Sequence, residues 1–214
     1  SLDAGRETNA GLLYKLLQEV ARSSNGTGRR LSVRYESGIQ WTGWRSSRDV
    51  IEGRGINRQI RRVYGFLSSR YHPGDRIWLF GYSRGGYAVR SLAGLIDRVG
   101  LLLPEHATER NIRLAYRYYE RNGDSPGASI FRERRCHPLV EVEMVGVWDT
   151  VKALGLRLPF VWKWAEAQHA FHNHHLGRSV RNGFHALALN ETRAVYEPVM
   201  WSSPEGWPGR VEQV

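Results

Sequence analysis

Apolar residues recur at helical spacing in several separate stretches of the chain. Residues 8–22 place leucines and a valine three or four positions apart, and a Ser-Ser-Asn-Gly-Thr-Gly run follows them. This spacing predicts an amphipathic helix, and the run predicts the loop that ends it. The same pattern predicts helices at 56–67, 107–121 and 179–189, and another directly after residue 83.

Short apolar runs between these helices predict strands. The clearest are residues 77–80 and 140–148, with a further alternating run at 31–35 and a short one near 199–201. Because strands alternate with helices, we expect an α/β fold with a mostly parallel sheet and helices on both faces. Ligands in such sheets bind beyond the carboxyl ends of the strands.

Composition fits one globular domain over residues 1–214. The chain has 41% hydrophobic residues, and no internal repeat or second domain is evident. No apolar run approaches the roughly 20 residues that span a bilayer, and no signal-peptide pattern opens the chain, so we expect a cytoplasmic protein in the producing cell. Cys136 is the only cysteine, so no intrachain disulfide is expected.

The net charge of +10 and the pI of about 10.2 raise the question of an anionic partner. Arginine supplies nearly all of the positive charge and is spread along the whole chain rather than gathered in one segment. This spread fits solvated helix and loop faces better than a nucleic-acid surface, so no nucleic acid is expected. Weak contact with an anionic membrane surface remains compatible with it.

The strongest chemical signal is Gly-Tyr-Ser-Arg-Gly at residues 81–85, directly behind the predicted strand 77–80. The G-x-S-x-G form is that of a nucleophile elbow, in which a serine lies on a tight turn between a strand and a helix. We expect Gly81 and Gly85 to be glycines because side chains there would collide with the neighbouring strand and helix. Ser83 is therefore the candidate nucleophile.

A serine nucleophile needs a base, and the base needs an acid that orients it. Asp149 ends the apolar strand 140–148 and is the candidate acid; the alternative is a helix cap or a salt-bridged carboxylate at the strand end. The backbone N–H of Arg84 is expected to form half of the oxyanion hole. No cofactor or metal is expected.

The base is harder to assign from the residues. His185 lies in an apolar run and is typical of a core histidine. The other histidines after Asp149 are crowded together, with no cysteine or carboxylate cluster beside them, and a solvated loop or helix end is favoured there over a metal site. They are His169, His172, His174 and His175.

Several segments resemble the first Tle group of type VI secretion phospholipase effectors, a family of α/β hydrolases. The resemblance lies in residues 80–87 with 90–96, in Gly-Val-Trp-Asp-Thr-Val at 146–151, and in His-Ala-Leu-Ala-Leu at 185–189. It implies that Ser83 and Asp149 are catalytic and that His185 is structural.

The resemblance also implies that segments at both ends of the catalytic domain lie outside this chain. The family's catalytic histidine belongs to an F-P-G-x-H-x-D-V-G-G segment, which would follow Val214. Its opening D-G-T-W-N strand end has no match before Thr8. We therefore expect the domain to be partial here, and residues 1–214 alone to have little or no activity.

The expected substrate is a carboxylic ester, and the resemblance implies phospholipid acyl esters cleaved in the manner of a phospholipase A. Residues 154–164 are apolar, aromatic and cationic, as in a lid or interfacial segment, although a buried connector has the same composition. An exported effector would meet an immunity protein and the secretion apparatus. The alternative is a non-catalytic or degenerate hydrolase-fold interaction module.

Overall fold

The structure of the chain is a computed structural model. It describes residues 2, 5, 7–23, 31–38, 54–121, 123–148, 176–188, 200–202 and 205–214. The chain divides into two compact units, Ser1–Gln40 and Trp41–Val214, which are described separately here.

The first unit contains helix α1 (Asn9–Ser23), which confirms the helix predicted at 8–22. The Thr8 hydroxyl accepts a backbone N–H of the first turn at 3.2 Å, as a helix N-cap does. The Tyr14 ring lies 5.1 Å from that of Tyr35, between centroids. Residues 31–35, predicted as a strand, form no strand in the structure.

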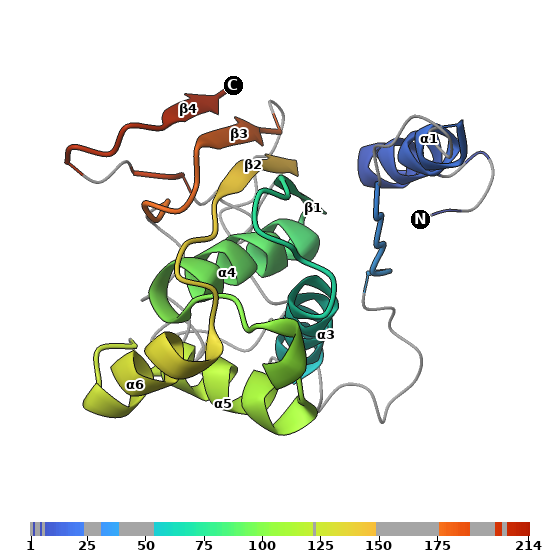
Figure 1. Ribbon diagram of the computed structural model, residues 1–214. Helices are drawn as coiled ribbons and strands as arrows, with labels where there is room; N and C mark the ends of the chain where they lie inside the picture. The colour runs from blue at the N-terminus through green and yellow to red at the C-terminus, as the bar shows by residue number, and fades with distance from the viewer. Residues whose placement is uncertain are drawn as a thin grey trace. The chain divides into compact units, whose positions relative to one another are not determined.

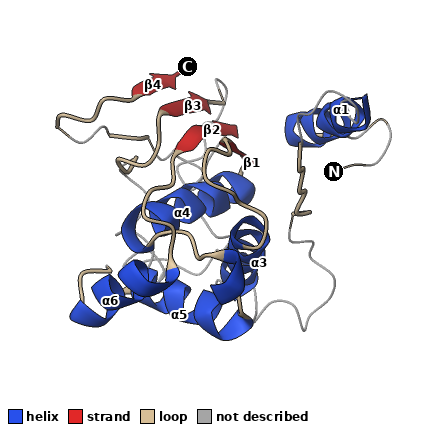
Figure 2. Cartoon of the chain, in the orientation of Figure 1, coloured by secondary structure: helices blue, strands red, loops and turns tan. Residues whose placement is uncertain are grey.

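The second unit is built of helices and short parallel strands (Figure 2). The helices predicted at 56–67 and 107–121 and the strands predicted at 77–80 and 140–148 are all present. The elements are α3 (Arg54–Ser68), β1 (Ile77–Tyr82), α4 (Arg84–Val99), the 3-10 turn η1 (Pro104–His106), α5 (Glu109–Glu120), α6 (Pro126–Arg135), β2 (Val142–Trp148), β3 (Asn182–Ala186) and β4 (Arg210–Gln213).

The four strands in the described part of the chain form one parallel sheet in the order β1-β2-β3-β4. Helix α4 packs against β1 and β2, and α3 and α5 pack against α4 on the side away from the sheet (Figure 1). A parallel sheet covered by the helices of its own crossovers is an α/β fold. The predicted fold class is confirmed.

The alternation of β1 decides which side chains face α4. Leu79 is buried, and the α-carbon of Gly81 closely approaches the first turn of α4. The alternate side chains of Trp78, Phe80 and Tyr82 point to the opposite face, where Trp78 is 44% exposed and Tyr82 48% exposed. The core therefore lies between the sheet and α4.

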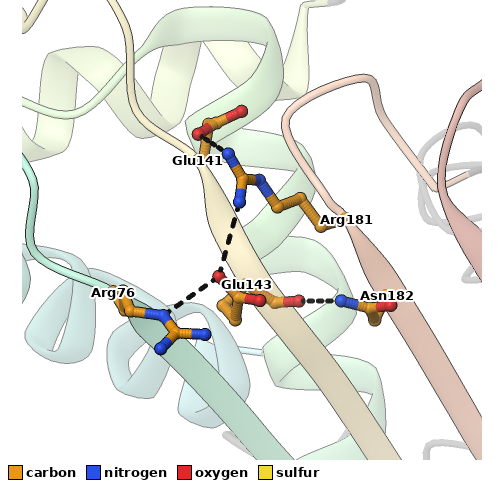
Figure 3. Close-up of polar contacts among 5 residues, drawn as sticks. All are labelled: Arg76, Glu141, Glu143, Arg181 and Asn182. Carbon is orange, nitrogen blue, oxygen red and sulfur yellow. Dashed lines mark hydrogen bonds and ion pairs between the residues drawn. The ribbon is translucent and has the colours of Figure 1, made fainter.

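A polar network joins the amino ends of β1, β2 and β3 (Figure 3). Arg76 Nε donates to Glu143 Oε2 at 3.2 Å, and the Asn182 side-chain amide donates to the Glu143 carbonyl oxygen at 2.8 Å. Arg181 donates to Glu141 at 2.5 Å and lies 3.8 Å from the Glu143 carboxylate. These contacts fix the strand ends opposite the edge where ligands bind in such sheets.

The helix predicted at 179–189 is wrong, because residues 182–186 form strand β3. The Asn-Gly-Phe-His-Ala sequence has weak strand propensity, and its pairing with β2 on one side and β4 on the other overrides local preference. The strand predicted near 199–201 is also wrong for the described residues 200–202, which hold only an isolated bridge. Helix α6 and strand β4 were not predicted.

Candidate functional site

Ser83 lies at the turn between β1 and α4, as the G-x-S-x-G pattern predicts. Its backbone has φ 52° and ψ −120°, and it is the one non-glycine residue with positive φ in the described parts of the chain. Its side chain makes no capping hydrogen bond to α4. Ser83 is half-buried at the carboxyl end of β1, and its hydroxyl does not cap the helix.

The glycine on the strand side of Ser83 is sterically required. A Cβ on Gly81 would lie 2.3 Å from the Gly85 carbonyl oxygen and 2.6 Å from the Gly86 nitrogen, both backbone atoms that cannot move aside. Gly85 differs from the expectation, because no described atom beyond its chain neighbours and its own helix backbone lies within 4 Å of its ideal Cβ position. Of the two glycines, only Gly81 is therefore at a position where a side chain would collide with neighbouring atoms, as predicted.

The carboxyl ends of β1 and β2 are tied together beside Ser83. Tyr82 pairs with Trp148, and the Ser83 backbone N–H donates to the Trp148 carbonyl oxygen at 2.9 Å, one position beyond the strand ladder. Asp149, the candidate acid, follows Trp148 in the sequence but lies outside the described residues. Its assignment as the acid stays a prediction.

Arg84 is the first residue of α4. The first turn closes with backbone hydrogen bonds from Gly86 and Tyr87 to the Ser83 carbonyl oxygen, at 2.9 and 3.3 Å. The Arg84 N–H thus stands at a helix N-terminus, where the aligned peptide dipoles favour negative charge. This is the setting that an oxyanion-hole donor needs, and the role stays a prediction.

His185 is a core residue, as expected. It is 1% exposed and lies on the buried, alternate positions of β3. Burial lowers its pKa to about 4, with the nearby Arg90 guanidinium adding to the effect and a hydrogen bond with Gln213 opposing it. An imidazole that stays neutral inside the core fits the structural role that was expected of it.

Several sequence predictions fall on parts of the chain that the structure leaves undescribed. The histidines at 169, 172, 174 and 175 and the segment 154–164 lie outside the described residues. Within the described ranges, no group of three or more His, Cys, Asp or Glu could hold a metal ion. Nor is any described helix long and apolar enough to cross a membrane.

Cys136 is buried, which raises its pKa to about 11 and keeps the thiol protonated.

An open hollow of about 360 Å³ lies on helix α5, apart from Ser83. Its lining is formed by Glu109, Arg110, Arg113 and Arg117, and a Glu109–Arg113 ion pair lies within it. A charged helix face of this kind, with an i,i+4 ion pair, is typical of a solvated surface. The hollow contains none of the candidate catalytic residues.

Sequence reasoning missed the aromatic packing behind the strand ends. The rings of Phe80 and Trp148 stack with centroids 6.1 Å apart, across Gly146 on β2. An isolated glycine inside an apolar strand marks a close approach of other atoms, and Gly146 is such a signal.

Over residues 2–214 the chain matches the family model described as T6SS, Phospholipase effector Tle1-like, catalytic domain. It is also similar to an uncharacterized protein of Saccharomyces cerevisiae (strain ATCC 204508 / S288c), YEL023C. The two are 33% identical over 175 residues, which cover 70% of this chain and 24% of that relative. The chain therefore spans only 24% of that relative's length. No solved structure matches the chain.

Proposed function

The chain belongs to the Tle1-like catalytic-domain family of type VI secretion phospholipase effectors, and we propose that it is the core of a serine hydrolase that cleaves phospholipid acyl esters. Ser83 is the nucleophile and Asp149 the acid of a Ser-Asp-His triad. The histidine belongs to the segment expected after Val214. The proposal concerns the whole protein that contains residues 1–214.

The backbone of Ser83 is the observation that carries this proposal. A serine at φ 52° and ψ −120° costs on the order of 1 to 3 kcal/mol, and such strain persists only where the surroundings enforce it. Here the close approach of Gly81 to the first turn of α4 enforces it. The turn places the serine directly after β1 at the carboxyl edge of the sheet, as a nucleophile elbow does.

The reaction follows from these positions. The histidine takes the Ser83 hydroxyl proton while Oγ attacks the acyl carbonyl carbon, and the carbonyl oxygen becomes an oxyanion that the Arg84 N–H stabilises. The C–O bond to the glycerol oxygen then breaks, and that oxygen leaves as an alcohol with the proton from the histidine. Water attacks the acyl-enzyme by the same route and releases the fatty acid and free Ser83.

The partners of the proposed enzyme follow from its family. We propose a phospholipid bilayer as the substrate surface and export by a type VI secretion apparatus, with an immunity protein protecting the producing cell. The net charge of +10 supports contact with anionic lipid headgroups.

Fatty-acid release from mixed phospholipid vesicles tests the proposal, with the whole gene product and its Ser83→Ala variant. Ser129→Ala is the matched control, because it removes a hydroxyl from an exposed position on α6. We expect release by the wild type and by Ser129→Ala, and none by Ser83→Ala. No release by the folded wild-type protein, or full release by Ser83→Ala, would contradict the proposal and favour a binding role for the domain.

A further inference from the structure

Three residues of β1 and β2 pack together on the sheet face opposite α4, directly below the candidate site. They are Phe80, Gly146 and Trp148, which are called the aromatic clamp below. Phe80 is opposite Gly146 in the strand register, and Trp148 lies two positions further along β2 on the same face. Residues at such diagonal positions reach one another only if their side chains are long or aromatic.

Gly146 makes room for this packing. A Cβ on Gly146 would lie 3.0 Å from Phe80 Cδ1 and 3.1 Å from Met144 Cε, which is tighter than ordinary van der Waals contact. The Phe80 ring therefore lies over the backbone of β2 at the one position without a side chain. From there it stacks on Trp148, with 6.1 Å between centroids and 28° between the ring planes.

Trp148 connects the clamp to the candidate nucleophile. Its side chain holds Phe80 on β1, and its backbone carbonyl accepts the Ser83 N–H at 2.9 Å. A shift of the Trp148 backbone would therefore move the acceptor of the Ser83 hydrogen bond. One residue thus links the stacked rings to the backbone that positions the candidate nucleophile.

We propose that the aromatic clamp is a positioning device that fixes the backbone of Ser83 at the carboxyl end of β1. The inference rests on the proposed function. Trp148 acts through Ser83 and is a positioning residue, not a catalytic one. Because a displacement of about 1 Å can cost on the order of 100-fold in rate, loosening the clamp should reduce kcat and leave substrate binding unchanged.

The test compares Trp148→Ala and Trp148→Phe in the whole protein, with a soluble short-chain ester as substrate. Trp78→Ala is the matched control. Trp78 lies on the same face of β1 at its amino end, is 44% exposed, and stacks under Arg76 instead of reaching the strand ends. The readouts are kcat, KM, and the rate at which a fluorophosphonate labels Ser83.

We expect Trp148→Ala to lower kcat and the labelling rate roughly 10-fold to 100-fold with KM unchanged, and Trp148→Phe to restore most of both. Trp78→Ala should leave them unchanged. Gly146→Ala displaces the Phe80 ring but keeps Trp148, so it should lower kcat in the same way. It is the test variant if Trp148→Ala does not fold.

Two outcomes overturn the inference: wild-type kcat in both Trp148→Ala and Gly146→Ala, or an equal fall in Trp78→Ala. If the wild-type protein hydrolyses no ester at all, the proposed function is wrong and the inference falls with it. Hydrolysis by the wild type, with the same kcat in the clamp variants, overturns the inference alone.

Discussion

The imidazole of His185 and the indole of Trp201 lie with their centroids 5.5 Å apart, on the side of β3 that faces α4. The Arg90 guanidinium of α4 lies 4.9 Å from the centre of the same indole. The side-chain amide of Gln213 on β4 accepts the backbone N–H of Trp201 at 2.8 Å and donates to the backbone carbonyl oxygen of Trp201 at 3.1 Å. Trp201 thus joins the helix to two strands around a buried, neutral histidine.

The first prediction is a loss of stability at acid pH that originates at His185. Burial lowers its folded pKa to about 4 from an ordinary value of 6.5, so the unfolded chain takes up the proton first. The contribution of the neutral, buried His185 to the free energy of unfolding is complete above pH 6.5 and is lost as the pH falls toward 4. Between about pH 7 and pH 5 the loss should be about 2 kcal/mol.

Urea unfolding at these two pH values, for the wild type and His185→Asn, measures this effect. We expect the variant to be less stable at neutral pH and to change less between the two pH values. Equal pH dependence in both proteins would show that His185 does not titrate on unfolding in this range.

The second prediction contrasts the two glycines around Ser83. Gly81→Ala should cost about 2 kcal/mol or more and abolish any activity of Ser83, because the new Cβ meets backbone atoms. Gly85→Ala should be neutral or stabilise by up to about 1 kcal/mol, because alanine favours helix and no described atom obstructs it. Denaturant midpoints of the two variants decide the matter, and similar losses in both would contradict this account.

The third prediction concerns the strain at Ser83. Glycine tolerates φ 52° and ψ −120° without the penalty of a Cβ, so Ser83→Gly should raise the free energy of unfolding by about 1 kcal/mol over Ser83→Ala. Both variants lack the hydroxyl and should be equally inactive. The measurement is a pair of urea unfolding curves, and a glycine variant less stable than the alanine variant would argue against a strained turn.

The fourth prediction addresses the ion pairs at the amino ends of the strands (Figure 3). The hydrogen bond from Arg76 lowers the pKa of Glu143 below its ordinary value of 4.5. The stabilisation by Glu143 is therefore present above that value and is lost as the pH falls through the lowered folded pKa. Glu143→Gln should give a small loss of stability near neutral pH, and the loss should shrink in high salt and at acid pH.

Glu133→Gln is the control for this prediction. It removes the same charge from an exposed position on α6 where the side chain makes no ion pair to a described residue. Thermal midpoints at low and high salt should separate the two variants. The prediction fails if Glu143→Gln and Glu133→Gln respond alike.

The sequence was a good guide where local pattern and tertiary packing agree. Helices α3 and α5 have apolar residues at regular helical spacing, and β1 and β2 are apolar runs that the fold buries. The turn at Ser83 was also predicted, because G-x-S-x-G after a strand describes a steric requirement that Gly81 then shows. These features depend on neighbours close in the chain.

Features that depend on distant neighbours were not predicted. Strand β3 contains Asn182, Gly183 and Ala186, and only its pairing on both sides makes it a strand. Helix α6 has few buried side chains, among them Phe131, and its start is set by the Ser125 cap. The stacking of Phe80 on Trp148 joins residues from separate strands, and the local signal, Gly146, marks a close approach without indicating which residues make it.

The order of strands in the sheet has a consequence for how the protein is made. Among the strands that the structure describes, β2, β3 and β4 each pair with the strand synthesised before them, so a chain emerging from the ribosome can extend this part of its sheet at one growing edge. The first such pairing, Ile77 with Val142, must wait for three helices to be translated. During that interval the edge of β1 that β2 later covers is unpaired, and it could pair with a wrong strand unless a chaperone shields it.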